Sequence, residues 1–150
     1  MEKELNPSSA AVVPVVHEVD ARAVPRRAKA SGLTVRRYFT TPGVDPADEI
    51  AWEYRTASIS GEDGKMVFEQ KNVEVPKAWS MLATNVVASK YFRGTPGTPE
   101  RETSVRRLVG RVADTITGWG EQGGYFATAE DKAAFHAELT HLLLRQKVAF

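Results

Sequence analysis

The sequence contains no cysteine, and this absence excludes several classes of protein. Without a thiol, its 150 residues cannot build a disulfide framework, a thiolate zinc site or a cysteine nucleophile. The sequence also lacks an apolar run near the roughly 20 residues of a membrane span. Its first residues lack the basic start and clean apolar stretch of a secretory signal. These absences predict a cytoplasmic protein that makes no use of a membrane.

Net charge is almost absent as well: the sequence has 20 lysines and arginines and 19 acidic residues, which gives a formal net charge of +1. A net charge this small gives no whole-chain argument for binding nucleic acid, so we do not expect nucleic acid as a partner. The 42% of hydrophobic residues is instead typical of one folded domain. Residues 21–44 hold no acidic residue, and residues 1–31 show no period. We interpret residues 1–31 as a flexible basic arm and residues 32–150 as the domain.

The first half of the domain predicts extended chain and a β-hairpin. Residues 32–43 are expected to be extended up to a turn at Pro42-Gly43, and Asp45-Pro46 starts a short helical turn. Residues 50–59 alternate in polarity, residues 60–64 form a turn, and a return strand begins at Lys65 and ends before Pro76.

Two helices are expected next, joined as a helical hairpin by a Gly/Pro/Thr connector. Residues 78–92 are apolar nearly all round, which is typical of a buried helix. Thr98 is expected to cap the second helix, with Pro99 at its first position. Its apolar arc comprises Val105, Leu108, Val109, Val112, Ala113, Ile116 and Trp119.

A third long helix is expected from Thr128, and it carries two apolar stripes instead of one. The first comprises Phe135, Leu139, Leu142 and Leu143, and the second Ala133, Ala137, Leu144 and Val148. No glycine, asparagine or proline stops this helix before Phe150. The fold class is therefore α+β and mainly α, with one apolar stripe more than a surface helix needs.

No group of residues in the sequence has the residue types and spacing that a catalytic, metal-binding or phosphate-binding site needs. His136 and His141 are five residues apart, which is the wrong spacing for two ligands on one helix face. Residues 94–98 lead toward a helix start, but Pro96 and the following Pro99 have no amide donor. Glu100 and Glu102 then follow where a phosphate would be repelled. We therefore predict no catalytic, substrate-binding, cofactor-binding or metal-ligating residue in this chain.

Four segments closely resemble the N-terminal region of adenosylcobalamin-dependent (class II) ribonucleotide reductases. They are GLTVRRYFTTPGVDP (32–46), VFEQKNVEVPKAWSMLATNVVASKYFRG (67–94), GTPERETSVRRLVGRVADTI (97–116) and ELTHLLLRQKVAF (138–150). The resemblance implies a ten-stranded α/β barrel, absent from this chain, in which a cysteine thiyl radical starts the reduction of ribonucleoside diphosphates. It also implies adenosylcobalamin, nucleotide effectors and thioredoxin as cofactor and partners of the complete enzyme.

The sequence departs from a complete member of that family in two respects. It has no cysteine, and it stops one residue short of the Asn-Ser-Pro segment that follows in the family. We therefore interpret it as the structural N-terminal flank of a barrel enzyme, inactive alone. The remainder of the reductase is its expected partner, docking on Leu144, Val148 and Phe150. The alternatives are a stand-alone module that binds nucleic acid or an acidic protein through the basic arm and, ranked last, a nucleotide-binding regulatory domain.

Overall fold

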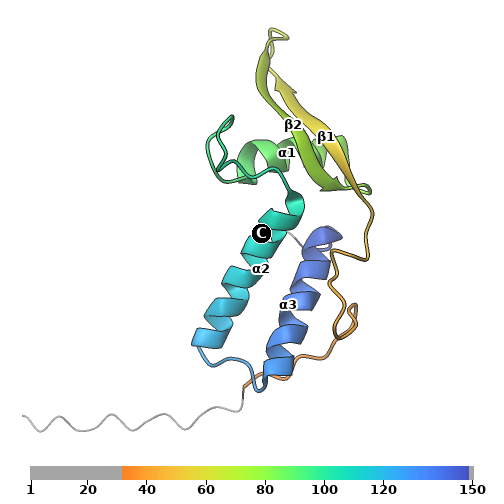
Figure 1. The fold of residues 1–150 in the computed structure, drawn as a ribbon, viewed down its shortest axis with the longest axis vertical. Coiled ribbons are helices and arrows are strands. Elements are labelled where there is room, and N and C mark those ends of the chain that lie inside the picture. Colours follow the sequence, from red (N-terminus) through yellow and green to blue (C-terminus); the bar gives the residue numbers. More distant parts are fainter. Residues whose placement is uncertain (1–31, 149–150) are drawn as a thin grey trace, which may run out of the picture. The chain divides into compact units, whose positions relative to one another are not determined.

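A small antiparallel sheet and three helices make up the part of the chain that the computed structural model describes, residues 32–148. The elements in order are β1 (Trp52–Ser60), β2 (Met66–Pro76), α1 (Met81–Val86), the π-helical turn η1 (Val87–Tyr91), α2 (Val105–Gln122) and α3 (Ala129–Leu144). Figure 1 shows α1 beside the hairpin of β1 and β2, and α2 side by side with α3. This arrangement confirms a small α+β segment. The basic arm predicted for residues 1–31 lies outside the described residues.

The hairpin buries one face against the helices. Strands β1 and β2 pair in register from Trp52 opposite Pro76 to Ser60 opposite Met66, with a bulge between Arg55 and Ala57. Ala57 of β1 and Val73 and Val75 of β2 are fully buried, whereas Tyr54 is 71% exposed. The covered face is thus the one that carries Ala57, and the predicted strands are confirmed.

Helix α1 is fixed to the hairpin by side chains of β1. The Ser80 hydroxyl accepts a hydrogen bond from the Ala83 amide at 3.0 Å and caps the helix. The helix therefore begins at Met81, three residues after the predicted start at residue 78. The Arg55 guanidinium donates to the Trp79 carbonyl at 2.6 Å and to the Thr84 hydroxyl at 3.0 Å. Only one side of this apolar helix is covered, since Leu82 remains 74% exposed.

The predicted start of the second helix at Thr98 is wrong. Helix α2 begins at Val105, and the Ser104 hydroxyl accepts from the Arg107 amide at 3.4 Å. Before it, the chain folds back along η1, where the Glu102 amide donates to the Arg93 carbonyl at 2.8 Å. These bonds hold residues 98–104 in an irregular segment, because a helix there would withdraw the Glu102 amide into its own ladder.

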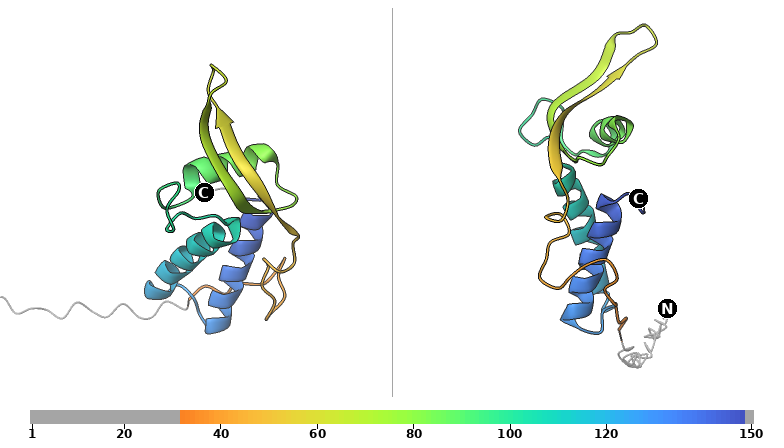
Figure 2. Two further views of the ribbon diagram at one scale, coloured as in Figure 1. Left: turned by 45° about the horizontal axis from the view of Figure 1, so that its top comes forward. Right: turned by 90° about the vertical axis from the view of Figure 1, so that its right-hand side faces the viewer.

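The expected pairing of the first two helices is also wrong, because α2 packs mainly on α3, whereas α1, apart from its continuation η1, packs on β1 (Figure 2). The contact between α2 and α3 is built from small buried residues: Ala113, Thr117, Gly120, Ala134, Ala137 and Thr140. Trp119, predicted in the apolar arc, is instead 65% exposed. A Cβ on Gly120 would lie 2.8 Å from the Phe126 ring, which fixes the side of α2 that turns inward.

Helix α3 ends at Leu144, although no residue of the usual stopping types is present. Gln146 takes the left-handed conformation, with φ of 52°. The Lys147 amide donates to the Leu142 carbonyl at 2.9 Å, and the Gln146 amide to the Leu143 carbonyl at 3.1 Å. This pair of bonds is a Schellman motif, with glutamine where glycine is usual. The prediction that nothing stops this helix is therefore wrong, while its start at the Thr128 cap is confirmed.

Candidate functional site

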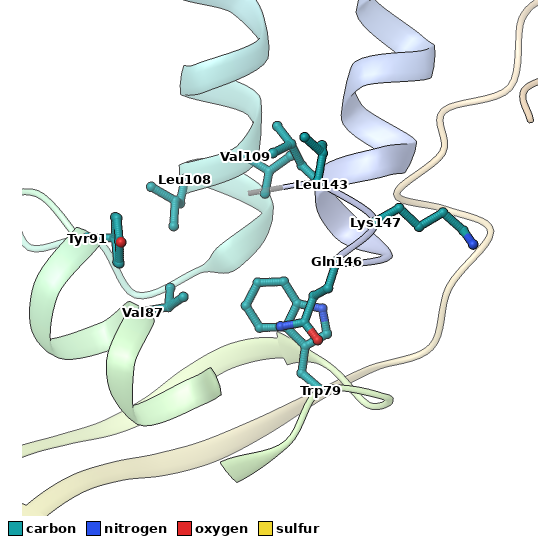
Figure 3. A pocket seen from close by; sticks show the side chains of 9 residues that line it. Trp79, Val87, Tyr91, Leu108, Val109, Leu143, Gln146 and Lys147 are labelled. Atoms are coloured by element: carbon teal, nitrogen blue, oxygen red, sulfur yellow. The ribbon is translucent and has the colours of Figure 1, made fainter. Parts of the chain in front are cut away.

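The main candidate site is an apolar groove of about 280 Å³ where η1, the start of α2 and the end of α3 meet. We call it the docking groove, and Figure 3 shows most of its side chains. They are Trp79, Val87, Tyr91, Leu108, Val109, Leu143, Gln146, Lys147 and Val148. Six of these nine are aliphatic or indole side chains, and none is a carboxylate. The groove therefore suits an apolar side chain better than a polar or anionic ligand.

One buried hydrogen bond sets the geometry of this groove. The Trp79 indole Nε1 donates to the Leu144 carbonyl at 2.8 Å and so joins the turn before α1 to the end of α3. A buried indole N–H needs such a partner, and the last carbonyls of a helix have none within the helix. The bond therefore satisfies two polar groups at once. It also holds the indole against the groove, where Figure 3 places it opposite Leu108 and Val109.

Behind the groove, Glu102 and Arg111 link the loop to α2. Arg111 binds both carboxylate oxygens of Glu102, at 2.8 and 3.0 Å, and the Arg93 amide donates to the same carboxylate at 2.9 Å. Burial raises the pKa of Glu102, but the bonds from Arg111 and Arg93 outweigh it and leave the pKa below its usual value. The carboxylate is therefore ionised at neutral pH, and its three bonds fix the loop before α2.

Arg101, the neighbour of Glu102, closes the end of η1. Its guanidinium donates to the carbonyls of Phe92 at 2.8 Å and Gly94 at 2.9 Å, and also to that of Ala88. These carbonyls have no partner in a continuing helix, so the arginine serves as their cap. The π-helical turn thus has a defined end, which positions Tyr91 at the rim of the groove.

On the outer side of α3, one carboxylate holds the extended segment. Glu138 Oε1 accepts from the amides of Tyr38, Phe39 and Thr40 at 3.0, 3.0 and 2.9 Å, and from the Thr40 hydroxyl at 2.7 Å. Three successive amides that converge on one oxygen form an anion-binding nest, here filled by the protein's own side chain. Burial raises the pKa of Glu138, but the Thr40 hydroxyl and these amides outweigh it, so the net pKa is lowered.

The predicted docking residues have separate positions in the structure. Leu144 is buried in the chain's own core, because the end of α3 turns inward under Trp79, so the second apolar stripe is not exposed at this residue. Its role in docking stays a prediction. Val148 lines the docking groove and is 43% exposed. Phe150 lies outside the described residues. The sequence did not predict Trp79, Val87 or Tyr91 as site residues. The only signal for them was the apolar character of residues 78–92.

The two histidines of α3 have different partners. His136 Nε2 lies 2.8 Å from an Asp114 carboxylate oxygen, whereas the ring of His141 stacks on Phe39 with centroids 4.8 Å apart. Burial and the nearby Arg145 lower the pKa of His141, so its ring is neutral at pH 7. Within residues 32–148, no three histidine, aspartate or glutamate side chains are grouped to hold a metal ion.

No helix in residues 32–148 has the length and apolarity to cross a bilayer. Among known proteins, the family model for class II vitamin B12-dependent ribonucleotide reductase matches residues 53–146. The vitamin B12-dependent ribonucleotide reductase of Rhodopirellula baltica is 52% identical over 126 residues, which cover 83% of this chain and 12% of that protein. The enzyme of the same name from Streptomyces coelicolor is 48% identical over 120 residues, covering 79% of this chain and 12% of that protein.

A third relative of that name, from Bradyrhizobium diazoefficiens, is 34% identical over 150 residues, with 78% of this chain and 12% of that protein covered. The chain thus spans about 12% of the length of these relatives. The family model covers more than half of the chain and agrees with all three relatives. This chain therefore belongs to the family of class II vitamin B12-dependent ribonucleotide reductases.

Proposed function

We propose that this chain is the N-terminal segment of a vitamin B12-dependent ribonucleoside-diphosphate reductase and acts there as a structural part. In this role it covers the barrel and holds the start of the catalytic polypeptide, while the catalytic groups lie in the remainder of the reductase. The observation that carries the proposal is the match over most of this chain to only 12% of each relative.

The chemistry of the residues supports a structural role. Thiyl-radical reduction of a ribonucleotide needs cysteine thiols, and the 150 residues contain none. The polar clusters Glu102–Arg111 and Glu138 with residues 38–40 are engaged in hydrogen bonds within the chain. Groups that are engaged in this way hold the loop before α2 and the extended segment in place.

Within residues 32–148, the grooves and their lining residues do not fit a cobalamin. A corrinoid is larger than the drug-sized ligands that occupy pockets of about 300–1,000 Å³, whereas the docking groove holds about 280 Å³. A second groove, between α2 and α3, holds about 500 Å³ and is lined by Asp114, Glu121, Lys132 and His136 among others. His136 is the histidine there, and its Nε2 is engaged by Asp114. We therefore assign cobalamin, ribonucleoside diphosphates and thioredoxin to the remainder of the enzyme.

The experiment separates the chain from the rest of the reductase. The 150-residue chain and the remaining polypeptide are purified separately and assayed for adenosylcobalamin-dependent reduction of ribonucleoside diphosphates, alone and mixed. We expect no turnover by the chain alone and a gain of turnover on mixing. Reduction by the isolated chain, or no complex between the two polypeptides, would refute the proposal.

A further inference from the structure

Residues 33–40, which we call the strap, run along α3 and are held there mainly by polar contacts. They lie outside the helices and strands, and Figure 1 shows them in orange beside α3. Their side chains bury little apolar surface, because Leu33 is 66% exposed and Tyr38 is 84% exposed. Among these side chains, only that of Thr40 is buried. Apolar burial therefore contributes little to holding the strap in place.

One end of the strap depends on a single carboxylate oxygen. Glu138 Oε1 accepts from the amides of Tyr38, Phe39 and Thr40 and from the Thr40 hydroxyl, at distances from 2.7 to 3.0 Å. The Phe39 amide also lies 3.2 Å from the second oxygen of the same carboxylate. Because these bonds share one acceptor group, a movement of the Glu138 side chain lengthens all of them at once. We therefore expect them to form and break together.

The rest of the strap is held by a second carboxylate and a short backbone pairing. The Val35 amide donates to Asp131 Oδ1 at 2.8 Å. The Leu33 amide donates to the Tyr125 carbonyl at 2.6 Å, and the Leu33 carbonyl accepts from the Ala127 amide at 3.1 Å. The small buried residues that hold α2 on α3 lie outside the strap. The strap can therefore leave α3 without breaking the contact between the two helices.

We propose that the strap opens from α3 as one unit, held closed by Glu138, while the helices and the hairpin stay folded. Segments that bury little apolar surface open at the lowest free energies within a native protein. Opening removes the Phe39 ring from its stack on His141 and from the Lys147 ammonium, which lies 5.8 Å from the ring centroid. Since Lys147 lines the docking groove, the closed strap restrains one lining side chain and the open strap releases it. This inference goes beyond the proposed function and does not depend on it.

The test is native-state hydrogen exchange of the full 150-residue chain, followed amide by amide by NMR at several urea concentrations below unfolding. The reference amides are those of Ala113 and Ala137, in the contact between α2 and α3. The strap amides followed are those that donate to carboxylates of α3: Val35, Tyr38, Phe39 and Thr40. We expect these four to share one opening constant, roughly a hundredfold larger than that of the reference amides. Urea should leave the strap constant nearly unchanged, because strap opening exposes little surface, and should raise the reference constants.

Two variants weaken the hold of Glu138 on the strap. Glu138→Gln removes the charge, and Thr40→Val removes the hydroxyl donor while keeping the shape of the side chain. Each should raise the opening constant about tenfold or more, including that of Val35, whose amide bonds to Asp131 instead. The matched control, Glu121→Gln, removes an exposed carboxylate of α2 that pairs with Lys132 at 2.7 Å, and it should leave the strap constant unchanged.

Three results would overturn the proposal. Strap amides that exchange as slowly as Ala113, with the same urea dependence, would show that the strap opens only when the whole chain unfolds. Faster exchange at residues 38–40 in the two variants without a change at Val35 would show that the two ends open separately. Strap amides that respond to neither variant would show that Glu138 does not hold the strap closed. Circular dichroism checks the folding of each variant, and Thr40→Val carries the test if Glu138→Gln does not fold.

Discussion

Replacing Glu138 by glutamine tests how the extended segment is held on α3. The carboxylate accepts hydrogen bonds from three backbone amides and the Thr40 hydroxyl. A hydrogen bond to a charged group contributes about 1.5–3 kcal/mol, and the neutral amide keeps one acceptor oxygen but loses the charge. The cluster is only partly buried, so we take the lower end and expect a loss of about 2 kcal/mol. For a domain of this size this corresponds to a fall in Tm of roughly 8 °C.

The pH dependence of this loss has a definite sign. The folded-state pKa of Glu138 is lowered, so its contribution is present above the unfolded pKa of about 4.3 and disappears as the pH falls through the folded-state pKa. Urea denaturation of the unaltered chain and of Glu138→Gln should therefore show a constant gap from pH 7 to about pH 5 and a shrinking gap below the unfolded pKa.

The matched control is Glu130→Gln, which removes an exposed carboxylate that pairs with Arg37 at 3.0 Å. An exposed ion pair contributes roughly 0–1 kcal/mol, so this variant should lose much less stability than Glu138→Gln. Equal losses for the two variants, or a gap for Glu138→Gln that persists unchanged well below pH 4, would refute the role of the nest.

Three further changes test the loop and the helix ends. Gly94→Ala should lower the unfolding free energy by at least about 3 kcal/mol, because its Cβ would lie 2.4 Å from the Glu100 carbonyl oxygen. Gly97→Ala is the control, since Gly97 has a similar φ but open space around it, and it should lower the unfolding free energy by only about 1 kcal/mol. Chemical denaturation measures both. Arg111→Ala should lower the unfolding free energy by about 3 kcal/mol by leaving Glu102 without its partner, and Glu102→Gln in the same chain should recover part of that loss. Gln146→Val should lower Tm more than Gln146→Gly, since a β-branched residue opposes the left-handed conformation at 52°; equal Tm values would argue against that conformation.

The sequence predicted those elements whose signals are local. The alternation of residues 50–59, the turn before Met66 and the Thr128 cap each depend on neighbouring residues, and the structure confirms them. The start of α2 was predicted wrongly because Thr98-Pro99 is a good local signal for a helix start, whereas the observed start depends on contacts with residues elsewhere in the chain. Glu102 is committed to Arg93 and Arg111, and a helix from Thr98 would break those bonds.

The candidate site was less predictable because it depends on which helices meet. The apolar surplus of residues 78–92 was visible, but the groove forms only where η1 approaches Leu108 and the end of α3. Leu144 was predicted as a docking residue because a helical wheel groups it with Val148 and does not show that the Trp79 indole covers its carbonyl. The helix end at Leu144 depends on Gln146 in a conformation that sequence patterns assign to glycine or asparagine.

The central claim, that this chain is a structural segment completed by the rest of a reductase, is tested most directly by titrating the chain into the remaining polypeptide. The measured quantity is adenosylcobalamin-dependent formation of deoxyribonucleotide. Our account predicts no product from the chain by itself and an activity that rises with added chain and saturates at a one-to-one ratio. Product from the isolated chain, or activity of the remaining polypeptide that added chain leaves unchanged, would contradict it.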